Sequence, residues 1–215
     1  MTAPAGAAGT VFVIDDDPSV RRALERQLRT AGFRVETFES AQDYVARAPQ
    51  AAIACIVTDV RMPGMSGLDL QASLARAGRE LPMVFITGHG DIPTSVRAMK
   101  GGAVNFLPKP FSEREILAAV AEALERSAAI EQERRETGSL RARYEALTAR
   151  EREVLALVAT GLLNKVIADR LGIQETTIKV HRGRVMEKME AASLADLVRM
   201  SERLGLAPGA DPARR

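Results

Sequence analysis

Acidic side chains in the first half of the chain stand directly after short apolar runs that predict β-strands. Residues 15–17 are three consecutive aspartates that follow the run 10–14, and Asp59 follows the run 54–58. Carboxylate oxygens are ligands that Mg²⁺ prefers, and a carboxylate beside cations can accept a phosphoryl group. The pattern therefore predicts magnesium-assisted phosphoryl transfer to an aspartate, if the fold brings the two acidic segments together.

Two further polar residues stand at the ends of two more apolar runs. Thr87 ends the run 83–87, and Lys109 comes shortly after the run 104–107. A lysine neutralises charge on phosphoryl oxygens and a hydroxyl donates a hydrogen bond to them, so both residues fit the same chemistry. A single aspartate at a strand end usually serves a turn or a helix cap, but that role does not explain the conjunction of these residues.

The elements that must position these residues alternate between strand and helix. The expected strands cover residues 10–14, 33–38, 54–58, 83–87 and 104–107, with helical spacing of apolar residues between them. This alternation predicts an α/β fold with a parallel sheet and right-handed crossovers. Ligands bind such sheets at the carboxyl ends of the strands, where all of these polar residues fall.

The second half of the chain shows no strand-like pattern and predicts an all-α domain of four helices. Thr148 and Glu151 have the spacing of a capping box, which opens a helix that Gly161 ends. Three more helices fit residues 164–171, 175–189 and 193–204. Apolar residues of the first two of these are spaced to pack across a tight turn at Gly172, which is typical of a helix-turn-helix that reads the major groove of DNA.

Composition places the chain among globular proteins, with 46% hydrophobic and 27% charged residues. Cys55 is the only cysteine, which excludes an intrachain disulfide and favours a reducing cytoplasm. No apolar run is long enough for a membrane span. The first 124 residues carry 13 basic and 14 acidic residues and the remainder carries 17 and 14, so the basic excess lies in the half that resembles a DNA binder.

We expect two domains joined by a linker. The charged stretch 131–136 and Gly138 indicate a linker that is helical at first and flexible near the glycine. The expected division is a disordered tail at 1–9, an α/β domain at 10–126, the linker at 127–144, a helical domain at 145–206 and a second disordered tail at 207–215.

The first domain resembles the receiver domain of two-component response regulators, which has a flavodoxin-like (βα)5 fold. The resemblance lies in VFVIDDDPSVRRAL, VTDVRMPGMSGLDL, VFITGHGD and FLPKPF, and the ITGHGD and AMKGGAVNFLPKPF segments are similar to FixJ-type receivers. It implies phosphorylation of Asp59 and Mg²⁺ bound by Asp16 directly, by Asp15 through water, by Asp59 and by the backbone carbonyl of Arg61. It also implies that Thr87 and Lys109 bind the phosphoryl group, that Phe106 is the switch aromatic, and that the bond between Lys109 and Pro110 is cis.

The second domain resembles the LuxR-type helix-turn-helix, in the segments LTAREREVLALVATG, NKVIADRLGI, TTIKVHRGRVMEKM and SLADLVRM. The resemblance places Lys179, Val180 and Gly183 where family members contact bases. It makes Asn164, Lys165, Thr176, Arg182 and Lys188 candidates for the DNA backbone. Because Gly183 has no side chain, either the helix backbone approaches the DNA closely there or specificity rests elsewhere.

Together the two resemblances imply a DNA-binding response regulator of the FixJ/NarL type that regulates transcription. The implied partners are a sensor histidine kinase, double-stranded DNA and a second copy of the chain after phosphorylation, with RNA polymerase a further candidate. No enzymatic turnover is expected beyond autophosphorylation from a phosphodonor and slow dephosphorylation. Two alternatives stay open: a DNA-binding regulator that ignores phosphorylation, and a haloacid-dehalogenase-type phosphatase that uses Asp15-x-Asp17 and leaves Asp59 without a role.

Overall fold

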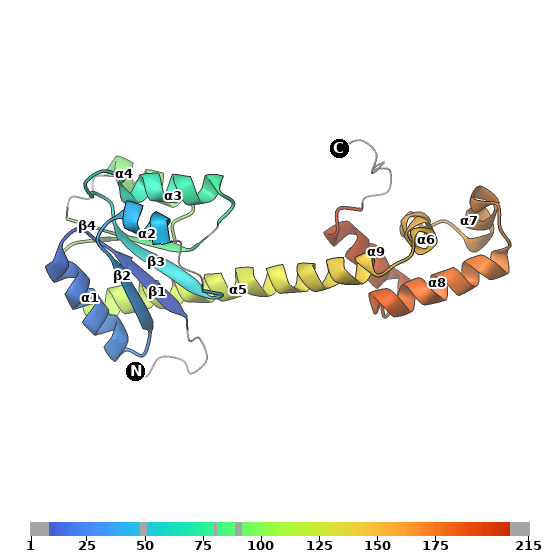
Figure 1. Cartoon of the computed structure of the whole chain (residues 1–215), viewed down its shortest axis with the longest axis horizontal. Helices are drawn as coiled ribbons and strands as arrows, with labels where there is room; N and C mark the ends of the chain where they lie inside the picture. The colour runs from blue at the N-terminus through green and yellow to red at the C-terminus, as the bar shows by residue number, and fades with distance from the viewer. Residues whose placement is uncertain (1–8, 48–50, 80, 89–91, 207–215) are drawn as a thin grey trace. The chain divides into compact units, whose positions relative to one another are not determined.

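The computed structural model describes residues 9–47, 51–79, 81–88 and 92–206, and the chain forms two compact units that divide between Gln132 and Glu133. The first unit holds a five-stranded parallel sheet of order β2-β1-β3-β4-β5 (Figure 1). The strands are β1 (Thr10–Ile14), β2 (Arg34–Phe38), β3 (Ala54–Asp59), β4 (Met83–Thr87) and β5 (Asn105–Pro108). The helices are α1 (Pro18–Thr30), α2 (Ala41–Arg47), α3 (Gly67–Arg76), α4 (Ile92–Lys100) and α5 (Glu113–Glu145).

The central strands are buried throughout, because helices pack hydrophobic side chains against both faces of the sheet. Leu24 and Leu28 of α1 and Val120 of α5 pack against one face. Tyr44 of α2 and Leu70 of α3 pack against the other. The predicted α/β class and all five predicted strands are confirmed, with the strand bounds shifted by at most one residue.

The order of the strands places the acidic segments side by side. The chain runs from β1 outward to β2 and then returns to place β3 on the other side of β1, so the strand order reverses there. Ile14 pairs with Thr58 in the parallel register, which aligns the carboxyl ends of β1 and β3. The residues that directly follow these ends therefore share the crevice where α/β sheets bind ligands.

The second unit is all-α, as predicted from the sequence. Its helices are α6 (Ala149–Ala159), α7 (Asn164–Leu171), α8 (Glu175–Met189) and α9 (Leu194–Arg203), together with the end of α5. The predicted capping box is present at the start of α6, where Thr148 and Glu151 satisfy each other's backbone amides. The core of this unit is built from Ile167 of α7 with Ile178 and Val185 of α8.

The linker expected at 127–144 is helical through Gly138, because α5 spans Glu113–Glu145, and the flexibility expected there stays a prediction. Leu140 is buried in the core of the second unit, and Arg143 forms an ion pair of 2.7 Å with Glu190. One glycine costs a helix only about 1 kcal/mol relative to alanine, so these contacts outweigh it. The tails predicted at 1–9 and 207–215 lie outside the described residues, apart from Gly9. No helix in the described ranges is long and apolar enough to cross a membrane.

Candidate functional site

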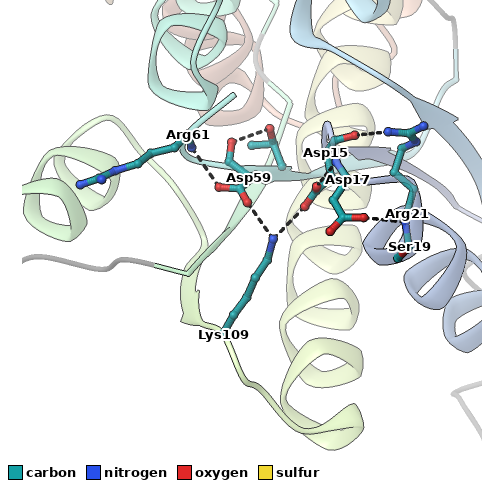
Figure 2. Close-up of polar contacts among 8 residues, drawn as sticks. Asp15, Asp17, Ser19, Arg21, Asp59, Arg61 and Lys109 are labelled. Atoms are coloured by element: carbon teal, nitrogen blue, oxygen red, sulfur yellow. Dashed lines mark hydrogen bonds and ion pairs between the residues drawn. The ribbon is translucent and has the colours of Figure 1, made fainter. Parts of the chain in front are cut away.

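The acidic crevice is organised around Lys109, whose ammonium group bonds to two aspartates at once. Its Nζ lies 2.9 Å from Asp15 Oδ2 and 2.7 Å from Asp59 Oδ2. Figure 2 shows the lysine side chain pointing between the two carboxylates, which come from the ends of β1 and β3. Three residues separated by up to 94 positions in the chain thus form one ion triad.

Burial and charge act in opposite directions on the members of this triad. Burial raises the pKa of Asp15 and outweighs the opposing hydrogen bond from Lys109. Burial acts to lower the pKa of Lys109, but its hydrogen bonds to Asp15 and Asp59 outweigh that effect and raise the pKa. The lysine is therefore held in its charged form, and Asp15 bears the unfavourable free energy of a buried carboxylate.

Backbone and arginine contacts fix the loops that carry the two aspartates. The amide of Arg61 donates to Asp59 Oδ1 at 2.9 Å, and the amide of Asp17 donates to Asp15 Oδ1 at 2.9 Å. Arg21 of α1 donates from Nη1 to the carbonyl of Asp15 at 2.6 Å (Figure 2). The sequence analysis did not single out Arg21, because helical spacing identifies its position on α1 but not the carbonyl that its side chain reaches.

The remaining predicted residues of the receiver site take distinct positions. Thr87 is buried at the end of β4, and its carbonyl accepts a hydrogen bond of 2.7 Å from the amide of Lys109. Phe106 is half-buried on β5, with its ring 6.5 Å from that of Phe85. Asp16 is exposed. The peptide bond between Lys109 and Pro110 is cis, as predicted.

Gly67 brings the start of α3 against β3, at the end that carries Asp59. A Cβ at this position would lie 2.3 Å from the carbonyl oxygen of Asp59, and 3.1 Å from side-chain atoms of both Thr58 and Phe85. The amide of Gly67 also donates to the carbonyl of Val60 at 3.1 Å. Only glycine permits this approach, which the sequence signalled merely as the first residue of a helix.

The site offers a limited set of ligands for a cation. Within the described ranges, no three aspartate, glutamate, histidine or cysteine side chains are arranged to hold a metal ion together, so Asp16 is not gathered with Asp15 and Asp59 into such a group. Mg²⁺ takes one or two carboxylates and keeps several waters. Asp15 and Asp59 already converge on one cationic group, so the donor set fits this ion.

The helix-turn-helix of the second unit is formed by α7, a tight turn and α8. Gly172 ends α7 in the left-handed conformation with φ of 64°, which strongly favours glycine. Ile178, Val185 and Met189 of α8 are buried, so the opposite face of α8 is presented outward. That face carries Lys179, Val180, Gly183 and Arg184, all exposed.

The predicted DNA-contacting residues fall into two groups. Lys165, Thr176, Lys179, Val180 and Gly183 are exposed on α7 and α8. Two of these make local contacts: Lys179 Nζ lies 3.4 Å from Glu175 Oε1, and Thr176 Oγ1 donates to Gln174 Oε1 at 3.4 Å. The three others make contacts between helices: Arg182 Nη1 donates to Asn164 Oδ1 at 3.0 Å, and Lys188 Nζ lies 2.6 Å from Glu151 Oε2. These contacts tie α8 to α7 and to α6.

Glu151 is an internal anchor that the sequence identified only as half of a capping box. Its side chain is 3% exposed and accepts hydrogen bonds from Lys188 and from the amide of Thr148. The hydrogen bond from Lys188, followed by that from the Thr148 amide, lowers the pKa of Glu151 to about 2. The same glutamate therefore caps α6 and binds Lys188 in the last turn of α8.

Both units match known families. The response regulator receiver domain family matches residues 11–121, and the LuxR family of bacterial regulatory proteins matches residues 145–201. The second match includes α6, α7 and α8 and all but the last two residues of α9.

Relatives match this chain over most of its length and most of their own. Nodulation protein W of Bradyrhizobium diazoefficiens is 50% identical over 94% of this chain and 89% of its own length. Transcriptional regulatory protein FixJ of Rhizobium meliloti is 44% identical over 93% of this chain and 98% of its own. The solved structure of the response regulator StyR is 49% identical, covers 92% of this chain and 100% of its own, and has a TM-score of 0.81. The chain therefore belongs to the response regulators that join a receiver domain to a LuxR-type DNA-binding domain and regulate transcription.

Proposed function

We propose that Asp59 accepts a phosphoryl group from the phosphohistidine of a sensor histidine kinase. A carboxylate oxygen would attack phosphorus while the bond from phosphorus to the histidine nitrogen breaks, leaving an acyl phosphate on Asp59. The carrying observation is that Asp59 lies at the strand end beside Lys109, with Nζ at 2.7 Å. In that position Lys109 neutralises charge on the phosphoryl oxygens.

We also propose Mg²⁺ as the cofactor, held by Asp15 through water, by Asp59, by the backbone carbonyl of Arg61 and directly by Asp16, whose exposed side chain would have to turn toward the ion. When bound, the ion supplies positive charge beside the transferring phosphoryl group. The support is chemical: the crevice holds an excess of carboxylates over cations, and burial raises the pKa of Asp15. A divalent cation relieves that imbalance, as Lys109 alone does not.

The signal would leave the site through Thr87 and Phe106. Thr87 ends β4 beside Lys109, where its hydroxyl can donate to a phosphoryl oxygen after a small loop movement. Phe106 is only half-buried, so it has room to turn inward as Thr87 moves. Phe106 lies on β5, which contacts α4, so the surface of α4 would change as Phe106 turns.

We propose that phosphorylation promotes a homodimer through the α4 face. Ile92, Val96 and Met99 of α4 are 80%, 44% and 48% exposed, and their spacing places them along one side of the helix. An exposed apolar stripe of this kind is typical of a protein interface. A two-fold dimer would present two helix-turn-helix domains to two half-sites of DNA. RNA polymerase would then be a further partner, and DNA in the cytoplasm the place of action.

For DNA we propose base contacts by Lys179 and Val180 and backbone contacts by Lys165 and Thr176. Leu163 and Gln174, the N-cap residues of α7 and α8, make no side-chain cap hydrogen bond. The first amides of both helices are therefore open to phosphate oxygens. Asn164, Arg182 and Lys188, which the family resemblance also nominates, would have to exchange their internal contacts for phosphates.

The test of the phosphoacceptor is labelling of the full-length protein by radioactive acetyl phosphate with and without Mg²⁺. Asp59→Asn should abolish the label, whereas Asp17→Asn should keep it, because Asp17 only caps α1 through the amide of Ser19. Undiminished labelling of Asp59→Asn would refute the assignment.

Equal DNA affinity with and without the phosphodonor would favour the regulator that ignores phosphorylation. The receiver match and the capping role of Asp17 speak against the phosphatase alternative.

A further inference from the structure

A pocket of about 200 Å³ lies in the first unit at the opposite end of β4 from the acidic crevice. Met83, the first residue of β4, lines the pocket, whereas Thr87 beside the crevice is the last residue of this strand. The four residue steps between them span about 13 Å of extended chain. The pocket is therefore separate from the proposed phosphoacceptor site.

The lining of this pocket combines apolar side chains with two arginines. Leu74 and Met83 are buried and Leu81 is half-buried. Arg79, which follows α3, and Arg126 of α5 also line the pocket, and no acid is among the described residues that do so. Because an apolar cavity of about 150 Å³ holds a benzene ring, this pocket has room for one ring or a short alkyl chain.

The charge of the lining favours an anion, although α3 and α4 both end beside the pocket and the last carbonyls of a helix carry partial negative charge. The turns that follow the two helices satisfy such carbonyls. The amide of Gly78 donates to the carbonyl of Ala75 at 3.0 Å, and the amide of Gly102 donates to that of Met99 at 3.0 Å. Arg126, by contrast, makes no hydrogen bond or ion pair with any residue that the structure describes. Its charge is therefore available to a ligand.

Gln71 connects the pocket to α4. It lines the pocket from α3, and its Nε2 donates to the carbonyl of Ala98 in α4 at 3.2 Å. A Cβ at Gly101, in the turn after α4, would overlap the Gln71 side chain, so the glutamine lies close against this turn. A ligand in the pocket would contact both Gln71 and the turn, since Gly101 also lines the pocket. It would therefore act on the helix whose exposed face we propose as the dimer interface.

We propose that this pocket is a regulatory site for a small organic carboxylate. The carboxylate group would bind Arg79 and Arg126, because a guanidinium group can donate two parallel hydrogen bonds to it. The apolar body would pack against Leu74, Leu81 and Met83. A ligand with one charge and one ring suits the small, mainly apolar lining, since each further charge would add to the cost of desolvation. The effect on α4 rests on the proposed phosphorylation switch, whereas the binding itself does not.

Titration of the full-length, unphosphorylated protein with sodium benzoate, followed by NMR, tests the site. Benzamide is the neutral control of the same shape, and inorganic phosphate is the control for charge alone. Arg126→Ala is compared with Arg114→Ala, which removes an exposed arginine of the same helix outside the pocket. Ala75→Leu, which would fill the pocket, is compared with Ala72→Leu at an exposed alanine of α3 that does not line it. Thermal unfolding checks that each variant is folded.

We expect benzoate to bind saturably and Arg126→Ala to weaken its binding about 10-fold to 100-fold, the loss of a charge-assisted hydrogen bond. Ala75→Leu should also weaken it, whereas Arg114→Ala and Ala72→Leu should bind like wild type. Absence of benzoate binding, or wild-type affinity in Arg126→Ala, would overturn the site. Benzamide or phosphate binding as tightly as benzoate would overturn its assignment to an organic carboxylate.

The same titration with Mg²⁺ and phosphoramidate, a phosphodonor that releases no carboxylate, tests the regulation. Coupled sites change each other's affinity by the same factor, typically about 5-fold or more. Benzoate affinity should change by at least that factor when Asp59 is phosphorylated, and Asp59→Asn should remove the change but keep the binding. Unchanged affinity in the phosphorylated protein would overturn the regulatory role. A wild type that takes up no phosphoryl group would instead contradict the proposed phosphoacceptor, while the binding test would still stand.

Discussion

Replacing Asp15 with asparagine should make the metal-free protein more stable, although it removes an ion pair with Lys109. Burial raises the pKa of Asp15, so the charged carboxylate destabilises the folded state at neutral pH. Asparagine keeps the shape and removes the charge, while Lys109 keeps its bond to Asp59. We expect the free energy of unfolding in EDTA to rise by about 1–2 kcal/mol, the usual gain at a strained functional residue.

The geometry of the triad gives the size of the repulsion that is relieved. The Oδ2 atoms of Asp15 and Asp59 lie 2.9 and 2.7 Å from the same Lys109 nitrogen, so they are at most about 5.6 Å apart. Two charges at that separation repel by about 3 kcal/mol at an effective dielectric constant of 20. At the same dielectric constant the lost attraction to Lys109 at 2.9 Å is about 6 kcal/mol, so relieved repulsion alone gives no gain. The net gain comes from burial of the carboxylate, which is the largest cause of the raised pKa of Asp15 and outweighs its favourable contacts.

Urea unfolding with and without Mg²⁺ provides the assay, and the order of the two proteins should reverse. A ligand at one hundred times its Kd stabilises the folded state by about 2.7 kcal/mol, and this benefit should shrink when Asp15 is neutralised. Asp17→Asn is the control, because Asp17 is exposed and asparagine caps helices as well; it should change little. A fall in stability of Asp15→Asn in EDTA would refute the reasoning.

The pH dependence of the same pair has a definite sign. An acid whose pKa is raised in the folded state binds protons more tightly there than in the unfolded chain. As the pH falls from neutral through the raised pKa of Asp15, the unfolding free energy of the wild type should rise relative to that of Asp15→Asn. The difference between the two free energies should be smallest near pH 3.9, which is about the pKa of aspartate in an unfolded chain. A gap that stays constant over this range would argue against Asp15 as its source.

Three further predictions concern other parts of the chain. Gly67→Ala should lower the unfolding free energy by about 1–3 kcal/mol, since its Cβ meets backbone at Asp59, and should slow phosphodonor labelling; normal values for both would remove the close-approach argument. Glu151→Gln should cost about 1–3 kcal/mol by leaving Lys188 unpaired, measured by urea unfolding. Because the pKa of Glu151 is lowered from 4.5 to about 2, this contribution should be complete above about pH 5, fall progressively as the pH drops below that, and be gone near pH 2. Val96→Asp should keep the phosphorylated protein monomeric in analytical ultracentrifugation, and a dimer of unchanged affinity would exclude the α4 face.

Most residues of the acidic crevice could be predicted because they follow the ends of predicted strands. Apolar runs define strands locally, and parallel topology then brings their carboxyl ends together whatever their separation along the chain. Asp59, Lys109 and Asp15 could be assigned to one crevice on that basis, and the structure places them there. The bound of β4 at Thr87 was also predicted from the apolar run alone.

Contacts between segments distant in sequence could not be predicted in this way. The family resemblance made Lys188 a candidate for the DNA backbone, but its pairing with Glu151 spans 37 positions and depends on how α6 packs on α8. The burial of Leu140, two residues after Gly138, depends in the same way on tertiary contacts that local propensity does not include. Local signals set the elements, and packing decides which side chains remain available.

Lysine and carboxylate meet in both units, and the balance of charge decides what each meeting does. Glu151 faces one lysine and one backbone amide, its pKa falls to about 2, and the pair holds α6 and α8 together. Lys109 faces two carboxylates, and the pKa of Asp15 rises because burial is not fully compensated. The first arrangement is satisfied and therefore structural. In the second arrangement the negative charge exceeds the positive charge, and a bound cation can balance it. Neutralising Asp15 should therefore stabilise the first unit, whereas neutralising Glu151 should destabilise the second.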